Sequence, residues 1–250
     1  MSLEIITMWY NEEFLAPYFL RHYAWADRIT LLYDVDSTDH CLLIAKSCPN
    51  VSVQPFRFPD MMDEELKRDR INAAYKQVRC DYALAVDADE FVFCKEGDVF
   101  HYDLRPFLAA NAAYDLFCVS LYQIYRHEDD APLNPDLPAV PQRRHGDPNM
   151  TGVNALYNKP ILARAGMAMA WTIGCHGITL EKGRLAPHSL PGAHWAMADS
   201  AFAVERRVKN RRLRQSRNNL EKGMTWQHHH VTEQSVLEEC ARHTRDPQLF

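Results

Sequence analysis

The chain has 250 residues, of which 47% are hydrophobic and 24% charged, a balance that suits one globular domain with a sizeable core. A formal net charge of -5 gives no overall attraction to nucleic acid or anionic membrane, so any such affinity needs a local patch. Seven scattered cysteines without a C-x-x-C pair argue against a disulfide framework or a zinc ribbon. No apolar run approaches the length of a spanning helix, and the opening MSLEIITMWYNEE soon turns acidic, so we expect a cytoplasmic protein.

Apolar runs of strand length alternate with stretches of helical period in the first part of the chain. Strands are predicted at 3–8, 29–33, 51–56 and 83–93, with helices between them at 12–26, 42–47 and 62–79. This alternation predicts an α/β fold with a mostly parallel central sheet and helices on both faces. In such sheets, ligands bind beyond the carboxyl ends of the strands.

The later part of the chain is less regular. Further strands are predicted at 116–122, at KPILARA and at AMAWTIG. Residues 128–149 contain five prolines and are predicted to form a long loop, which in a compact domain is often a binding element or a lid. Helical patterns run from Asp199 to Lys222 and from Thr232, a suitable cap, to His243.

Three carboxylates, Asp87, Asp89 and Glu90, follow the apolar run ALAV of the fourth predicted strand. On an extended chain Asp87 and Asp89 point the same way, about 7 Å apart between Cα atoms, so both can reach one divalent cation. Oxygen ligands suit Mg²⁺ or Mn²⁺, which take the rest of their shell from water and phosphate. The pattern therefore predicts a site for a metal and a diphosphate, with Glu90 bracing the turn. A plain strand cap is the alternative, because Asp is common in turns.

Other motifs occur at fitting distances from this pair. TMWYNEE follows the first strand, YDVDSTDH follows the second, and Asn72 lies fifteen positions before Asp87 (87 − 72). Together these resemble the nucleotide-sugar half of glycosyltransferase family 2, which has the GT-A fold. DADEF, KPILAR, GCHG and HWAMADSAF with ERR resemble a small bacterial branch of that family. Departures are Val35 and Asp36 in place of the family's D-G, and Ile71 at its arginine position.

The resemblance implies a metal-dependent, inverting transferase that moves a sugar from a nucleotide-diphosphate donor to a glycan or lipid-linked acceptor in polysaccharide biosynthesis. The residues implied to contact the nucleotide are Asn11, Glu12, Asp34, Asn72 and Asp87, with Asp34 on the base or ribose. Asp87, Asp89 and a late histidine, His176, would hold Mn²⁺ or Mg²⁺. For Asp34 and His176, turn formation or a structural role remains an equal alternative.

The roles of further polar residues are inferred from their chemistry. His194 could bind a phosphate or the acceptor, and the tract His228–His230 is interpreted as solvated, because three adjacent residues cannot all face one ion. A catalytic base must reach the acceptor hydroxyl. Its candidates are Glu128, Asp129, Asp130 and Asp199, the last of which also suits a helix N-cap.

Residues 205–222 carry eight lysines or arginines and are interpreted as a solvated helix face. If this segment has a function, it suits peripheral contact with an anionic membrane, at the inner face of the cell membrane. Nucleic acid is not expected as a partner, because no aromatic residues are interleaved with the charges.

We expect one GT-A-like domain over 1–250, with a nucleotide-sugar half at 1–100, an acceptor half at 101–198 and C-terminal helices at 199–250. Two other functions stay open. One is a catalytically idle relative that binds a nucleotide or sugar, and the other is a different metal–phosphate enzyme such as a nucleotidyltransferase or a phosphatase. A P-loop hydrolase is excluded, because no G-x-x-x-x-G-K-[ST] motif is present.

Overall fold

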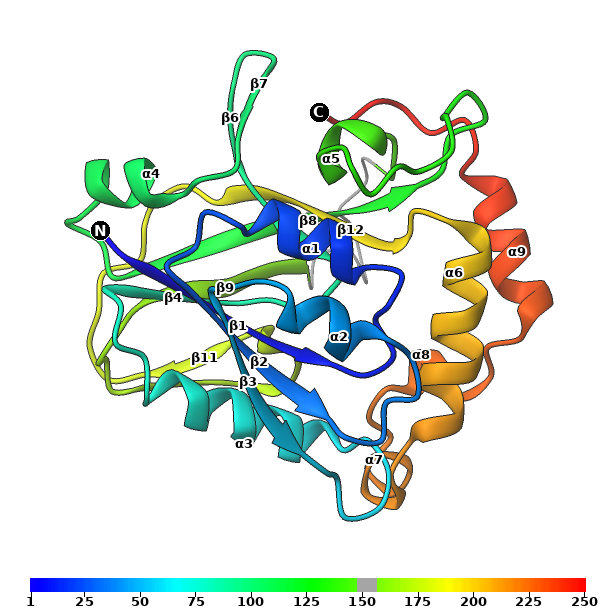
Figure 1. Ribbon diagram of the computed structural model, residues 1–250, viewed down its shortest axis with the longest axis horizontal. Helices are drawn as coiled ribbons and strands as arrows, with labels where there is room; N and C mark the ends of the chain where they lie inside the picture. The colour runs from blue at the N-terminus through cyan, green and yellow to red at the C-terminus, as the bar shows by residue number, and fades with distance from the viewer. Residues whose placement is uncertain (148–156) are drawn as a thin grey trace.

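The structure of the protein, a computed structural model, describes residues 1–147 and 157–250 and is built around an eight-stranded sheet (Figure 1). In spatial order the strands are β3 (Val51–Phe56), β2 (Arg28–Asp34), β1 (Leu3–Trp9), β4 (Tyr82–Ala85), β9 (Asn158–Arg164), β8 (Leu116–Tyr125), β12 (Leu190–Met197) and β5 (Glu90–Val92). Four of the seven neighbouring pairs are parallel: β3–β2, β2–β1, β1–β4 and β8–β12. The predicted α/β class with a mostly parallel sheet is confirmed.

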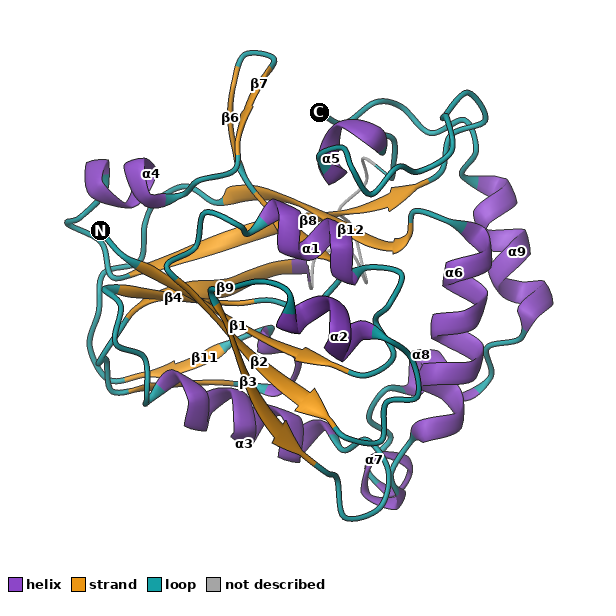
Figure 2. Cartoon of the chain, viewed as in Figure 1, coloured by secondary structure: helices purple, strands orange, loops and turns teal. Residues whose placement is uncertain are grey.

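Helices cover both faces of the sheet formed by the first four strands (Figure 2). The connections β1–β2 and β2–β3 run through α1 (Ala16–His22) and α2 (Cys41–Lys46) on one face, and α3 (Glu64–Tyr75) returns to β4 across the other. The chain moves from β1 outward to β3 and then back to β4 on the other side of β1. Because each crossover is right-handed, reversing the direction of movement places the connecting helix on the opposite face of the sheet. The carboxyl ends of β1, β2 and β4 consequently meet at one edge, which is where a ligand site is expected.

Several short elements go beyond the sequence prediction. The predicted strand 83–93 is divided, because a turn separates β4 from β5, and β5 pairs antiparallel with β12. The strand β12 was not predicted, because Pro191 and Gly192 interrupt its strand signal. The other additions are β6 (Cys94–Glu96), β7 (Val99–His101), β11 (Ile178–Leu180), α4 (Arg105–Ala110) and α5 (Ala139–Gln142). The strand predicted at AMAWTIG is confirmed as the shorter β10 (Met169–Trp171).

The C-terminal segment lies at the carboxyl ends of the early strands (Figure 1). The helix predicted from Asp199 to Lys222 is wrong as a single element. It is divided into α6 (Ser200–Val204), a π-helix Glu205–Arg211, a 3-10 turn Arg212–Arg214 and α7 (Arg217–Glu221), and α8 (Trp226–His229) and α9 (Glu233–Arg242) follow. The capping of the last helix by Thr232 is confirmed, since its side chain accepts a hydrogen bond from the Ser235 N–H. No helix within the described ranges is long and apolar enough to cross a membrane.

Candidate functional site

The Asp87–Glu90 stretch forms a tight turn at the carboxyl end of β4. The Glu90 N–H donates to the Asp87 carbonyl at 3.1 Å, and the Glu90 carboxylate accepts the Asp87 N–H at 3.0 Å. Lys159 Nζ lies 2.6 Å from the same carboxylate. Glu90 therefore braces the turn, as predicted. The expected extended conformation of Asp87 and Asp89 is wrong, because this turn replaces the strand.

Both aspartates of the turn are paired with cations. Asp87 Oδ1 lies 2.8 Å from Lys67 Nζ. Asp89 is only 3% exposed and has Arg206 Nη2 at 3.2 Å and His194 Nε2 at 3.3 Å. Burial by itself raises the pKa of each carboxyl, but Lys67 beside Asp87 and Arg206 beside Asp89 outweigh it, so both pKa values lie well below the usual range. Both groups are therefore ionised and can act as ligands.

A hydrogen bond between Gln123 and Nδ1 fixes the orientation of the His194 ring. The Gln123 amide nitrogen lies 3.3 and 3.4 Å from the carbonyl oxygens of His194 and Ile124, so its Oε1 accepts the His194 Nδ1–H at 2.7 Å. His194 Nε2 is thereby left to face Asp89. A histidine that donates one ring N–H to a fixed acceptor and turns the other nitrogen toward a carboxylate has the arrangement found at metal sites.

His176 reaches the same cavity from a short 3-10 helix, Ile173–Cys175. Gly174 has a positive φ of 64°, and a Cβ placed there would lie 2.6 Å from the His176 ring. This close approach explains why a glycine precedes the histidine in the sequence. His176 and His194 thus both approach the Asp87–Asp89 turn, and Tyr157 contacts both rings, at centroid distances of 6.4 and 4.9 Å.

These groups line a cavity of about 390 Å³, which we call the carboxylate cavity. Its volume lies within the range of small-molecule sites, about 300–1,000 Å³. The polar side chains around it are those of Glu64, Lys67, Asp87, Asp89, Gln123, Tyr125, Tyr157, Lys159, His176, His194, Arg206, Arg207, Arg211, His228 and Glu239. His228 was predicted to be solvated together with His229 and His230, and for His228 this prediction is wrong. Burial lowers the pKa of His228 to about 3. Its neighbour His229 instead bonds to the Met224 carbonyl, at 3.0 Å.

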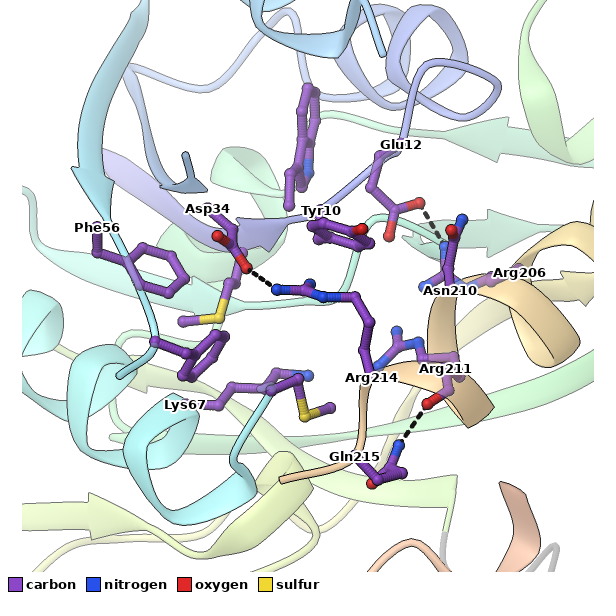
Figure 3. A pocket seen from close by; sticks show the side chains of 14 residues that line it. Tyr10, Glu12, Asp34, Phe56, Lys67, Arg206, Asn210, Arg211, Arg214 and Gln215 are labelled. Carbon is purple, nitrogen blue, oxygen red and sulfur yellow. Dashed lines mark hydrogen bonds and ion pairs between the residues drawn. The ribbon is translucent and has the colours of Figure 1, made fainter. Parts of the chain in front are cut away.

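A second cavity adjoins the first at the carboxyl ends of β1 and β2, and we call it the Asp34 cavity (Figure 3). Asp34 is 1% exposed and lies 2.9 Å from Arg214 Nη2, and the Arg214 guanidinium lies 3.4 Å from the centre of the Tyr10 ring. Glu12 pairs with Arg206 nearby. Burial raises the pKa of Glu12 to about 7, although Arg206 opposes the rise. The remaining volume is only about 40 Å³.

The two predicted asparagines have structural partners. Asn11, with a positive φ of 52°, accepts the Thr38 N–H at 2.7 Å and so joins the loops that follow β1 and β2. Asn72 exchanges two hydrogen bonds of 3.0 and 2.8 Å with the Trp171 backbone and anchors β10 to α3. Neither side chain lines the two cavities. Their contact with a nucleotide stays a prediction.

Three of the four predicted base candidates lie on the loop after β8, outside both cavities. Glu128 is half exposed and pairs with Arg245, and the side chain of Asp129 is 88% exposed. Asp130 accepts the His127 N–H at 2.8 Å. Residues 148 and 149, the end of the predicted proline-rich loop, lie outside the described residues. Asp199 caps α6 by accepting the Phe202 N–H at 3.0 Å, in line with the N-cap alternative.

The basic segment 205–222 differs most from the sequence interpretation. The prediction that its eight basic residues form a solvated face is wrong for half of them. Four line the two cavities: Arg206, Arg207, Arg211 and Arg214. They face inward because the ends of β2 and β4 place buried carboxylates there, and buried carboxylates need paired cations. Sequence reasoning could have used this signal, since the acidic strand ends lacked an assigned counterion.

The chain is distantly similar to several solved structures. No protein-family model and no curated protein matches the chain. Staphylococcus aureus TarS has a TM-score of 0.46 and 14% identity over 88% of this chain and 45% of its own. TarS 1–349 in complex with UDP-GlcNAc has a TM-score of 0.39 and 17% identity over 66% and 45%. Glucosyl-3-phosphoglycerate synthase from Mycobacterium tuberculosis, in complex with Mn²⁺, UDP and phosphoglyceric acid, has a TM-score of 0.34 and 14% identity over 49% and 43%. The chain thus spans less than half of each of these chains, and scores this low assign it to no family.

Proposed function

We propose that the protein is a glycosyltransferase of GT-A type that binds a nucleotide-diphosphate sugar across the two adjoining cavities. One observation carries this proposal. Lys67, Arg206 and Arg211 line both cavities, so three cations lie between the Tyr10–Asp34 pair and the Asp87–Asp89 turn. A nucleotide sugar has the same sequence of groups: a flat base, two negatively charged phosphates and a polar sugar.

Each part of the donor has a chemically matched part of the site. Tyr10 offers a stacking face and Asp34 a fixed acceptor for a base N–H or a ribose hydroxyl. The three shared cations neutralise the diphosphate, and arginine suits this task because its planar fork matches phosphate oxygens. The sugar then lies in the carboxylate cavity, near Asp87 and His176. Glu12 also lines the Asp34 cavity. Contact of Asn11 and Glu12 with the nucleotide stays a prediction.

A divalent metal fits the residues present. Asp89 and His194 would hold Mn²⁺ or Mg²⁺, since Gln123 turns His194 Nε2 toward the carboxylate. Coordination by Asp87 and His176 stays a prediction. Within the described residues no group of three or more His, Cys, Asp or Glu side chains could hold a metal. The donor phosphates would therefore complete the shell, as is usual for Mg²⁺. When bound, the metal supplies Lewis-acid stabilisation of the departing diphosphate.

Acceptor activation requires a proton acceptor in the carboxylate cavity. Glu239 and His228 line it, whereas Glu128, Asp129 and Asp130 stay predictions. Glu239 accepts the Tyr125 hydroxyl at 3.0 Å and pairs with Arg207. We favour Glu239, because its carboxylate is already directed into the cavity. Burial lowers the pKa of His228, which disfavours the protonated form that a base has to adopt.

The remaining details rest on the family resemblance alone. They are inversion at the sugar, a glycan or lipid-linked acceptor, and a role in polysaccharide biosynthesis. Contact with an anionic membrane would depend on the basic residues of 205–222 that stay outside the cavities: Lys209, Arg212, Arg217 and Lys222. Three of these already pair with Glu205, Glu221 and Glu65, which weakens the membrane proposal.

The test is release of UDP or GDP from UDP- and GDP-sugars in the presence of Mn²⁺. We expect turnover by the wild type, and a loss of at least about a hundredfold in Asp89→Asn, which removes one charge from the proposed metal and diphosphate site. Asp98→Asn, on the exposed tip between β6 and β7, is the matched control and should keep full activity. Binding of nucleotide without turnover of any donor would instead support the catalytically idle relative.

A further inference from the structure

The side chain of Arg214 occupies the space between Tyr10 and Asp34 (Figure 3). Its guanidinium lies 3.4 Å from the centre of the Tyr10 ring, and Nη2 is 2.9 Å from Asp34 Oδ2. Asp34 is 1% exposed, and the Arg214 side chain is only 12% exposed. The contact joins residues 180 positions apart in the chain, so the fold itself brings this arginine to the end of β2.

A guanidinium and a nucleobase present similar surfaces to such a site. Both are flat, both stack on an aromatic ring, and both can offer N–H donors in their plane to a carboxylate. The volume left in the Asp34 cavity is about 40 Å³. This holds about one water molecule and not a base. Arg214 and a nucleobase therefore cannot occupy this space together.

We propose that the space between Tyr10 and Asp34 is the base subsite and that Arg214 fills it in the free protein, so a nucleotide must displace this side chain to bind. This inference rests on the proposed function, because it assumes that a nucleotide is the ligand. The displacing group must stack on Tyr10 and donate an N–H to Asp34, which uracil and guanine can both do.

Displacement requires movement of a side chain rather than of the whole segment. The Ser216 N–H donates to the Met62 carbonyl at 3.0 Å and ties the segment to the residue before the Asp63 cap of α3. Within the segment, Gln215 Nε2 donates to the Arg211 carbonyl at 2.6 Å. These bonds hold the backbone around Arg214 in place. Arg206 and Arg211 can thus keep their positions between the cavities while Arg214 turns outward. The apparent nucleotide affinity equals the intrinsic affinity multiplied by the fraction of molecules in which the subsite is empty.

The test compares the dissociation constants of UDP and GDP for wild type, Arg214→Ala and Arg214→Gln by calorimetry. We expect Arg214→Ala to bind about tenfold more tightly, because no pair with Asp34 has to be broken. Arg214→Gln, which keeps a neutral donor and much of the volume, should lie between the two and serves if the alanine variant folds poorly. Arg217→Ala removes the same charge from an exposed side chain of the same segment and should match wild type.

A second measurement tests whether Arg214 acts by occupying the base subsite or only by its charge. Methylguanidinium at millimolar concentration should enter the space in Arg214→Ala and compete with UDP or GDP, while leaving wild-type binding unchanged. Weaker or equal nucleotide binding by Arg214→Ala, with measurable wild-type binding, would overturn the inference and leave the proposed function standing. Failure of wild type and both variants to bind either nucleotide would overturn the proposed function, and the inference with it.

Discussion

At the scale of single residues, the site combines buried carboxylates with buried cations. Asp87, Asp89 and Glu90 pair with Lys67, Arg206 and Lys159 respectively, and each pair lies in a largely buried environment. Removing one partner of such a pair leaves an uncompensated charge, which typically costs about 3–5 kcal/mol. Asparagine or glutamine substitutions are therefore better probes here than alanine, because they keep the hydrogen-bonding shape.

Substitution of Gly174 should destabilise the protein through the His176 ring. Gly174→Ala adds a methyl group 2.6 Å from the His176 ring and must displace it, whereas Gly97 has a similar positive φ with nothing within 4 Å. Both alanine variants should lose about 1 kcal/mol from the unfavourable φ. We expect Gly174→Ala to lose at least about 1 kcal/mol more in urea unfolding, from displacement of the ring. Equal losses in the two variants would show that His176 is not held against Gly174.

At the scale of elements, Asp63 ties the first half of the chain to the C-terminal segment. It caps α3 by accepting the N–H groups of Glu65 and Leu66, and its other oxygen accepts Ser216 Oγ at 3.0 Å and Asn218 Nδ2 at 2.9 Å. Its pKa is lowered because these hydrogen bonds together outweigh the opposing effect of burial. The same carboxylate thus positions both α3, which carries Lys67, and the segment that carries the four inward arginines.

We therefore expect Asp63→Ala to lower the free energy of unfolding by about 2 kcal/mol, the upper end for loss of a cap. It should also weaken nucleotide binding, because the segment 205–222 loses its attachment to α3. Asp69→Ala, on an exposed part of the same helix, controls for loss of charge and should change stability by less than about 0.5 kcal/mol. A stability loss without any change in nucleotide binding would show that the attachment does not position the site.

The sequence predicts those parts of these elements that depend on local signals. The strand–helix alternation locates β1 to β4 and α1 to α3, and turn-forming acidic residues mark the ends of β2 and β4. The π-helix and β12 could not be predicted, since the first requires tertiary packing and the second is interrupted by Pro191 and Gly192. The pairing of Arg214 with Asp34 joins positions far apart in sequence, and residue spacing carries no information about such a contact.

At the scale of the whole molecule, His22 links stability to pH. Its Nε2–H donates to the Val92 carbonyl at 2.8 Å, and burial lowers its pKa from 6.5 to about 4. Between these two values the unfolded state binds the proton more readily, so the contribution of His22 to stability is full above pH 6.5 and is lost as the pH drops toward 4. A shift of this size corresponds to about 3 kcal/mol.

His22→Gln keeps a donor for the Val92 carbonyl but cannot titrate in this range. We expect its free energy of unfolding to fall less than that of wild type between pH 7 and pH 4.5, as measured by urea titration at several pH values. The exposed His188→Gln should keep the wild-type slope. Identical slopes for wild type and His22→Gln would contradict a neutral, buried His22.

The Asp87–Asp89 turn and its cations are proposed to form a nucleotide-diphosphate site. The most direct measurement is calorimetric titration of UDP and GDP, with and without Mn²⁺, into wild type and the Asp87→Asn/Asp89→Asn variant. We predict that wild type binds one of the nucleotides more tightly with Mn²⁺ and that the double variant loses this metal-dependent gain. Equal affinity with and without metal in both proteins, or no binding of either nucleotide, would contradict the claim.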